Sequence, residues 1–173
     1  MDRGSSGPVI DKGKTNVQQY DFEESIGYWL TMATQAYHRS LADELAPHGI
    51  TFRQAQVLGW LALKGDLSQT ELARRMMVEP PTLVSILDRM EREGWISRRT
   101  CQSDRRRKYV QLNAAAEPGW DRVLESARKI RAQASEGLSD KQAETLKNLL
   151  RVVHQNLGTS SAGENCAALE KVV

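Results

Sequence analysis

Cysteine, aromatic residues and long apolar runs are all scarce in this chain of 173 residues. The two cysteines, Cys101 and Cys166, are too few for the disulfide framework of a small secreted domain. No apolar segment approaches the roughly 20 residues that a membrane-spanning helix needs, and the first residues, MDRGSSGPVIDKGK, lack the apolar core of a signal peptide. We therefore expect a cytoplasmic protein that makes no contact with a membrane.

Signatures of catalytic and metal sites are missing as well. His38, His48 and His154 are scattered along the chain and match no metal-ligand spacing. The motifs HExxH, CxxC and GxGxxG and the P-loop do not occur. We therefore predict no enzyme activity, no metal and no cofactor.

The total charge identifies no partner, because 24 basic and 22 acidic residues leave a formal net charge of only +2. The placement of the charges is more informative. It draws attention to residues 68–112, where arginines gather around short helix and strand patterns.

Residues 68–93 have the pattern of two helices joined by a short turn. Ser68 followed by Glu71 predicts a capping box, in which each side chain satisfies a free amide at the helix start. Pro80 and Pro81 predict the start of a second helix, because proline is tolerated in a first turn. The linker MMVEP is too short for the helices to separate, so we predict a helix-turn-helix.

At about 100° per residue, the second helix divides into two faces. One face is apolar and is predicted to be buried: Leu83, Ile86, Leu87 and Met90. The other carries short hydroxyls and arginines: Thr82, Ser85, Arg89 and Arg92. Such a face can enter a major groove and reach base edges and phosphates. For the helix taken alone, an ordinary solvated face is the alternative.

A β-hairpin is predicted next. The segments WISRRT and RKYVQL are rich in Trp, Ile, Tyr and Val and flank the polar sequence CQSDRR. Between Gly94 and Leu112, six basic residues accompany one acid, Asp104. We expect this charge to require a polyanion, because DNA would neutralise it and release counterions.

The stretch resembles the winged helix-turn-helix of the MarR family of bacterial transcriptional regulators. The matching segments are Gln69–Ala73, Pro81–Val84, Leu87–Glu91, Gly94–Ile96, Asp104–Arg106 and Val110–Leu112. The combination of Asp-Arg-Met-Glu near the helix end with Asp-Arg-Arg at the hairpin tip is specific. The resemblance implies a mainly α fold with a small β-hairpin wing, and with N- and C-terminal dimerisation helices.

The resemblance extends more weakly over residues 20–157, which we expect to form a single MarR-like domain. Residues 1–19 and 158–173 are expected to be flexible tails. The parts of the domain are a DNA-binding lobe at 51–112 and dimerisation helices at 20–50 and 113–157.

Apolar residues at spacings of three and four predict further helices. Their ranges are Asp21–Ala46, Thr51–Lys64, Asn113–Gly137 and Ser139–Leu157, each capped by its first residue. Thr51 with Gln54 predicts a second capping box. Pro118 is expected to disturb the first turn of the third. One small lobe cannot bury all of these stripes, so the first, third and fourth helices are expected to interleave in a homodimer. Such a dimer would present two recognition helices about one DNA turn apart.

Separate DNA contacts are expected from the parts of the winged lobe. Phosphate contacts are expected from Gln69, Thr70, Arg98, Arg99 and Lys108, with Ser68 at the same helix start. Base contacts in the major groove are expected from Thr82, Ser85 and Arg89, with Pro81 beside them. Arg105 or Arg106 is expected to enter the minor groove, held in its pose by Asp104. For Arg89, a salt bridge with Asp88, Glu91 or Glu93 is the alternative.

The resemblance also implies release from DNA by a small aromatic or phenolic acid. Tyr37, His38, Arg39 and Trp60 are the candidate ligand-binding residues, and ordinary core aromatics with a surface histidine and arginine are the alternative. A redox-responsive regulator would use Cys101, because neighbouring arginines lower a thiol pKa.

The sequence therefore predicts a sequence-specific transcriptional regulator, a repressor that binds double-stranded DNA. The alternatives are an architectural DNA-binding protein of low specificity and a protein-interaction module that uses the helical dimer.

Overall fold

A computed structural model describes residues 21–100 and 108–158. The chain divides into two compact units, Met1–Ala36 and Tyr37–Val173, which are described separately. The predicted tails lie outside the described residues, except for Gly158 at the end of the last helix. Within the described ranges, no helix is both long enough and apolar enough to cross a bilayer.

Helix α1, Ile26–Leu45, begins in the first unit and ends in the second. Its predicted start at Asp21 was wrong. The Asp21 carboxylate accepts a hydrogen bond from the Glu23 amide (3.1 Å), which forms a local turn ahead of the helix. The Trp29 Nε1–H also donates a hydrogen bond to the Glu23 carbonyl oxygen (2.7 Å), which connects this turn to α1.

The predicted end of α1 is confirmed. A 3₁₀ turn, η2 (Ala46–His48), follows Leu45, with Pro47 in its first positions. Gly49 then adopts a φ of 69°, which ends the helical segment.

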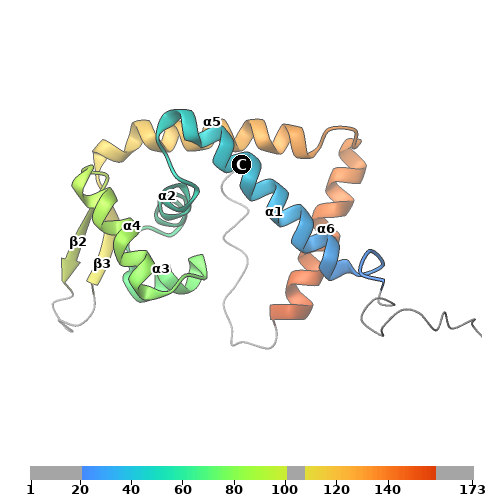
Figure 1. Cartoon of the computed structure of the whole chain (residues 1–173), viewed down its shortest axis with the longest axis horizontal. Helices are drawn as coiled ribbons and strands as arrows, with labels where there is room; N and C mark the ends of the chain where they lie inside the picture. Colours follow the sequence, from blue (N-terminus) through green and yellow to red (C-terminus); the bar gives the residue numbers. More distant parts are fainter. Residues whose placement is uncertain (1–20, 101–107, 159–173) are drawn as a thin grey trace, which may run out of the picture. The chain divides into compact units, whose positions relative to one another are not determined.

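The second unit contains a winged helix-turn-helix lobe (Figure 1). Its elements are α2 (Phe52–Lys64), β1 (Leu67–Ser68), α3 (Gln69–Met76), α4 (Pro80–Arg92), β2 (Ile96–Thr100) and β3 (Lys108–Leu112). The antiparallel strands have the order β1-β3-β2, with Ile96 opposite Leu112 and Thr100 opposite Lys108. The mainly α fold with a hairpin wing is confirmed, whereas β1 was not predicted because two residues are too short to show a strand pattern.

The core of this lobe consists of the inward faces of α2, α3, α4 and the sheet. Its fully buried large side chains include Leu58, Leu72, Met76, Leu83, Leu87, Met90, Ile96 and Val110. Three of the four residues in the predicted apolar face of α4 are buried, and the fourth, Ile86, is half-buried. The periodicity of α4 therefore predicted its orientation correctly. With the apolar face buried, Thr82 and Ser85 are exposed.

Two more helices follow the wing. They are α5 (Glu117–Ala134), preceded by a 3₁₀ turn η3 (Ala114–Ala116), and α6 (Asp140–Gly158). The irregular start expected from Pro118 is confirmed, since this 3₁₀ turn comes first and Pro118 lies in the first turn of α5. Buried Val123 and Ile130 on the predicted apolar stripe of α5 belong to the core of the second unit.

The predicted helix caps had different outcomes. Thr51 and Gln54 form the expected capping box, and Ser139 forms one with Gln142. Asn113 does not cap a helix. Its Nδ2 donates to the Gly94 carbonyl oxygen (2.9 Å) and its Oδ1 accepts from the Ser97 hydroxyl (3.0 Å), so it closes the base of the wing.

Candidate nucleic-acid interface

The start of α3 is built by Ser68. Its hydroxyl accepts a hydrogen bond from the Glu71 amide (3.2 Å), which is one half of the predicted capping box. The Glu71 carboxylate binds Arg74 (2.9 Å) and Arg75 (2.5 Å) instead of completing the box. Hydrogen bonding from Arg74 is the main cause that holds the pKa of Glu71 below its ordinary value. Ser68 is buried, and its hydroxyl oxygen is occupied in this cap.

Two other predicted phosphate contacts lie at the same helix start. Thr70 is exposed, and Gln69 is half-buried. The Gln69 Nε2 atom is buried and has no hydrogen-bond partner among the described residues. Thr70 is therefore the more accessible of the two.

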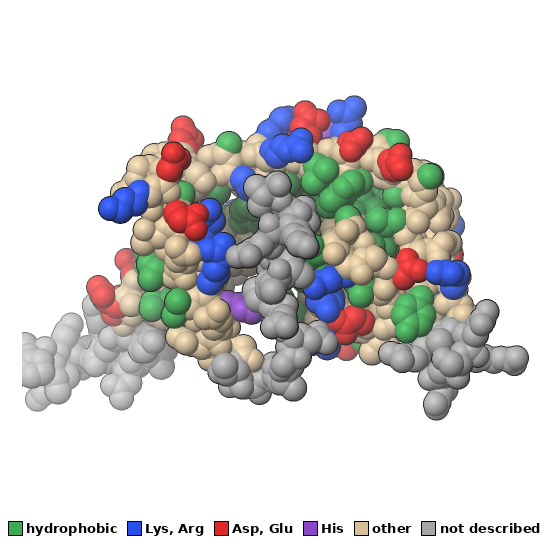
Figure 2. Space-filling model, turned by 180° about the vertical axis from the view of Figure 1, so that it is seen from behind, with side chains coloured by type: hydrophobic (Ala, Val, Ile, Leu, Met, Phe, Trp, Pro, Cys, Tyr) green, Lys and Arg blue, Asp and Glu red, His purple; other side chains and the backbone are tan. Residues whose placement is uncertain are grey.

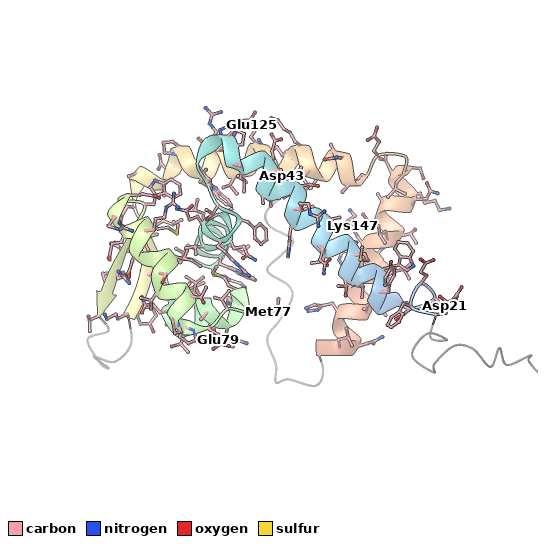
Figure 3. All side chains as sticks on the ribbon, in the orientation of Figure 1. Asp21, Asp43, Met77, Glu79, Glu125 and Lys147 are labelled. Carbon is pink, nitrogen blue, oxygen red and sulfur yellow. The ribbon has the colours of Figure 1, made fainter. Side chains whose placement is uncertain are left out.

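The start of α4 cannot donate backbone hydrogen bonds from its first two positions, which are Pro80 and Pro81. The preceding residue, Glu79, occupies the N-cap position without a side-chain cap bond. Figure 3 shows Glu79 beside Met77 at the turn between α3 and α4. The first turn of α4 therefore offers a partner its side chains more than free amides.

The outward face of α4 carries the predicted base-reading residues. Pro81, Thr82, Ser85 and Arg89 are all exposed. The Ser85 hydroxyl donates to the Pro81 carbonyl oxygen (3.2 Å), which leaves its oxygen lone pairs as acceptors. The structure thus brings these four residues together on one accessible helix face.

Arg89 has an internal partner. Its Nε lies 2.9 Å from Glu93 Oε1, which is one of the salt bridges considered as an alternative role. The second oxygen of Glu93 accepts from Nε2 of the buried Gln54 (3.0 Å). Any contact between Arg89 and a base must therefore compete with this ion pair.

Acidic side chains from other elements pair with arginines of the wing strand β2. Arg98 binds Glu91 (2.5 Å) and Asp88 (2.6 Å) on α4. Arg99 binds Asp66 (2.6 Å), which precedes β1. The hairpin charge was expected to require a polyanion, but acids of other elements already pair with two of its six basic residues, Arg98 and Arg99.

The two paired arginines differ in exposure. The side chain of Arg99 is 65% exposed and that of Arg98 only 19%. Hydrogen bonding from Arg98 is the main cause that lowers the pKa of Glu91, and Glu91 in turn raises the pKa of Arg98. Arg99 is accessible to a phosphate, whereas Arg98 faces α4.

Lys108 is exposed at the start of β3. The remaining wing predictions concern Cys101, Asp104, Arg105 and Arg106, which lie outside the described residues. On the face seen in Figure 2, basic and acidic side chains are interspersed, in keeping with the small net charge. The described part of the interface is therefore the outward face of α4 with the base of the wing.

The four predicted ligand-binding residues make contacts of different kinds. Half-buried Tyr37 packs against the core, and Arg39 is exposed. The His38 ring lies 4.4 Å from the Phe52 ring. The Trp60 ring has the Arg75 guanidinium 5.1 Å from its centre. His38 and Arg39 are the two exposed members of this set.

Sequence reasoning missed Gln54 and Asp66 as supports of the interface, and did not pair Glu91 with Arg98. The spacing of Thr51 and Gln54 predicted the helix cap. No local pattern in the sequence links Gln54 to Glu93, which lies 39 positions later. Among the described residues, no group of three or more His, Cys, Asp or Glu side chains could hold a metal ion.

Comparisons with known proteins agree with this geometry. Residues 48–107 match the MarR family. A probable transcriptional regulator from Pseudomonas aeruginosa is 30% identical, with a TM-score of 0.66 over 77% of this chain and 99% of that one. A mutant of E. coli MarR, solved in complex with operator DNA, is 25% identical, with a TM-score of 0.65 over 73% of this chain and 91% of that one.

A third solved structure is similar in fold. It is Bordetella bronchiseptica BpsR, solved in work on the regulation of its DNA binding by 6-hydroxynicotinic acid. It is 21% identical, with a TM-score of 0.68 over 83% of this chain and 99% of that one.

Proposed function

This chain belongs to the MarR family of DNA-binding transcriptional regulators, and from that premise we propose that it is a homodimeric repressor of transcription. The regulators of this family are not enzymes. The proposed repressor binds a pseudo-palindromic operator in double-stranded DNA. Helix α4 enters the major groove and the wing reaches the adjacent minor groove.

The observation that carries this proposal is the outward face of α4. Thr82, Ser85 and Arg89 are exposed together, while the opposite face is fixed in the core by Leu83 and Leu87. A rigidly held helix with hydroxyls and an arginine on its free face can contact base edges with defined geometry. The operator complex of the E. coli relative adds support for a DNA partner.

Exposed apolar side chains support the homodimer. Helix α6 has no buried residue, although its large apolar side chains recur along its length: Leu146, Leu149, Leu150, Val152 and Leu157. In the first unit, Phe22, Ile26, Trp29 and Met32 are also exposed. A second copy of the chain would remove such surfaces from water.

A small aromatic acid is the proposed effector. Exposed His38 and Arg39 offer hydrogen-bond donors to a carboxylate, and the His38 ring lies against the Phe52 ring. Trp60 and Tyr37 supply further aromatic surface on the second unit. Redox control through Cys101 is the alternative. It would be favoured if an oxidant abolished DNA binding by the wild type but not by the Cys101→Ser variant.

The test begins with the full-length wild-type chain and a randomised double-stranded DNA library. We expect enrichment of a pseudo-palindrome whose half-sites lie about one helical turn apart. Arg89→Ala should weaken binding to the enriched duplex by about tenfold, with little change for unrelated DNA. Arg128→Ala, which removes an exposed arginine from α5, is the matched control and should change neither affinity.

Other results of this binding experiment would indicate a different function for the chain. Equal affinity and an equal salt slope for all sequences would identify an architectural DNA-binding protein. No affinity for any duplex would leave a protein-interaction module. A panel of benzoate, salicylate and hydroxynicotinate tests the effector, since release of the enriched duplex by none of them would remove that part of the proposal.

A further inference from the structure

Among the described arginines that were expected to touch DNA, which are Arg89, Arg98 and Arg99, Arg98 is the most enclosed. It lies on β2, and 19% of its side chain is exposed. Its Nε and Nη2 both donate to Glu91 Oε2, at 3.0 and 2.5 Å. Its Nη2 also donates to Asp88 Oδ1 at 2.6 Å. The guanidinium is therefore directed at the recognition helix and away from solvent.

The backbone of Arg98 takes part in the same contact. Its amide donates to Glu91 Oε1 (3.2 Å), so one carboxylate receives hydrogen bonds from both the main chain and the side chain of a single residue. Glu91 lies near the end of α4 and Arg98 is the third residue of β2, and the two elements lie side by side in Figure 1. This arrangement ties the recognition helix to the first strand of the wing.

We propose that Arg98 is a positioning residue, which fixes the wing strand β2 against the recognition helix α4 and does not itself bind phosphate. This inference rests on the proposed function, because the wing needs a fixed position only if it binds DNA together with α4. The wing tip and α4 would contact different grooves, so their relative position sets which operators both can reach at once.

The connection between α4 and β2 is a short turn at Gly94. Gly94 has a φ of 76°, a backbone conformation that allows the chain to turn sharply after α4. On the other side of the strand, Asn113 joins the Gly94 carbonyl oxygen to the Ser97 hydroxyl. Asn113, which follows β3, therefore holds the start of β2, and Arg98 holds the same strand to α4.

The charges lead to the same assignment. Asp88 and Glu91 place carboxylates on α4, where they would repel phosphates if they were unpaired. Arg98 pairs with both carboxylates and its single charge offsets one of the two, so this charge is already committed within the protein. Arg99 contrasts with it, because its ion pair with Asp66 is exposed on both sides and can be exchanged for a phosphate at little cost.

The test uses the full-length protein and the duplex that it enriches from a randomised library. Hydroxyl-radical footprinting reports minor-groove protection by the wing, and dimethyl sulfate protection reports α4 in the major groove. The variants are Arg98→Lys, Arg98→Gln and Glu91→Gln, with Arg99→Gln as the neighbouring control. Thermal unfolding shows whether each variant folds. If Arg98→Gln does not fold, the test is decided by Arg98→Lys and Glu91→Gln.

The positioning role predicts a distinct pattern. Arg98→Lys keeps the charge but loses the planar fork, so it should lose the wing footprint and retain major-groove protection. Glu91→Gln makes the surface more positive, yet it should also lose the wing footprint and bind at least about tenfold more weakly. Arg99→Gln should retain both footprints and reduce the salt slope by about 0.9, as expected for one lost phosphate contact.

Other results overturn the inference. A phosphate contact predicts that Arg98→Lys binds normally, that Arg98→Gln reduces the salt slope, and that Glu91→Gln binds more tightly with both footprints intact. Loss of the wing footprint in Arg99→Gln would show that the effect is not specific to Arg98. If the wild-type chain enriches no duplex, the proposed function fails, and the inference fails with it. Wild-type binding with unaltered footprints in the variants rejects the inference alone.

Discussion

At the scale of single residues, Gln54 connects two helices of the winged lobe. It is 1% exposed. Its Oε1 accepts from the amide and the hydroxyl of Thr51, both at 2.9 Å, and its Nε2 donates to Glu93 at 3.0 Å. Glu93 also binds Arg89. One buried amide therefore connects the start of α2 with the end of α4.

Replacing Gln54 by leucine should destabilise the protein. The change removes these hydrogen bonds at a buried position and deprives Glu93 of a donor, which costs about 1–3 kcal/mol. Urea unfolding monitored by circular dichroism measures the loss. Gln56→Leu is the control, because Gln56 has an exposed contact with Arg53 and should cost no more than about 0.5 kcal/mol. Equal losses in the two variants would contradict the role of Gln54.

The ion pair of Glu91 predicts how stability depends on pH. Hydrogen bonding from Arg98 lowers the pKa of Glu91 below its ordinary value of 4.5. Its contribution is therefore complete above pH 4.5 and is lost as the pH falls through the lowered pKa. The free energy of unfolding should decrease with acidification in this range. Glu91→Gln should be less stable at neutral pH and show a shallower decrease, and a slope equal to wild type would refute the prediction.

At the scale of elements, the turn between α3 and α4 contains a strained residue. Met77 ends α3 with a φ of 50°, in the left-handed region. Its amide bonds to the carbonyl oxygens of Ala73 and Arg74, and its side chain is 89% exposed. The turn needs this backbone conformation, whereas the methionine side chain adds almost no packing.

Met77→Gly should therefore stabilise the helix-turn-helix. Relief of the left-handed conformation is partly offset by the greater chain entropy of glycine, and we expect a gain of roughly 0.5–1 kcal/mol. Thermal and urea unfolding provide the measurement. Met77→Ala keeps the strain and should give no gain. If alanine stabilises as much as glycine, the exposed thioether and not the backbone is the cause.

Local patterns were sufficient to predict most elements of the winged lobe. The periodicity of α4, the capping box of Thr51 and the β-rich segments of the wing depend on neighbours in sequence, and all three are confirmed. Asp21 and Asn113 were wrong as caps because their side chains found other nearby partners, in a turn and at the wing base. Cap residues predict a helix start only when no competing backbone group lies within reach.

The ionic contacts of the interface could not be predicted in this way. Arg99 meets Asp66 across 33 positions of sequence, through the pairing of β1 with β3 and of β3 with β2. Counting charges along the hairpin treated Arg98 and Arg99 as unpaired, although the fold brings acids to both. Assigning roles to surface arginines therefore requires the tertiary structure.

At the scale of the whole molecule, the large apolar side chains left exposed are concentrated in a few segments. In the first unit they lie between Phe22 and Met32, and in α6 they lie between Leu146 and Leu157. None of the 19 residues of α6 is buried. A helix with an apolar stripe and no buried side chain gains little stability alone, so the proposed homodimer offers a reason for its presence.

The last prediction concerns this stripe. Leu149 is 59% exposed in the single chain, and Leu149→Glu would place a carboxylate inside the proposed dimer interface, which costs on the order of several kcal/mol. Sedimentation velocity should show a dimer for wild type and a monomer for the variant, with DNA affinity lost in parallel. Gln155→Glu adds the same charge about 120° away on α6 and should remain dimeric. A dimeric Leu149→Glu protein, or a monomeric wild type, would exclude α6 as the dimerisation helix.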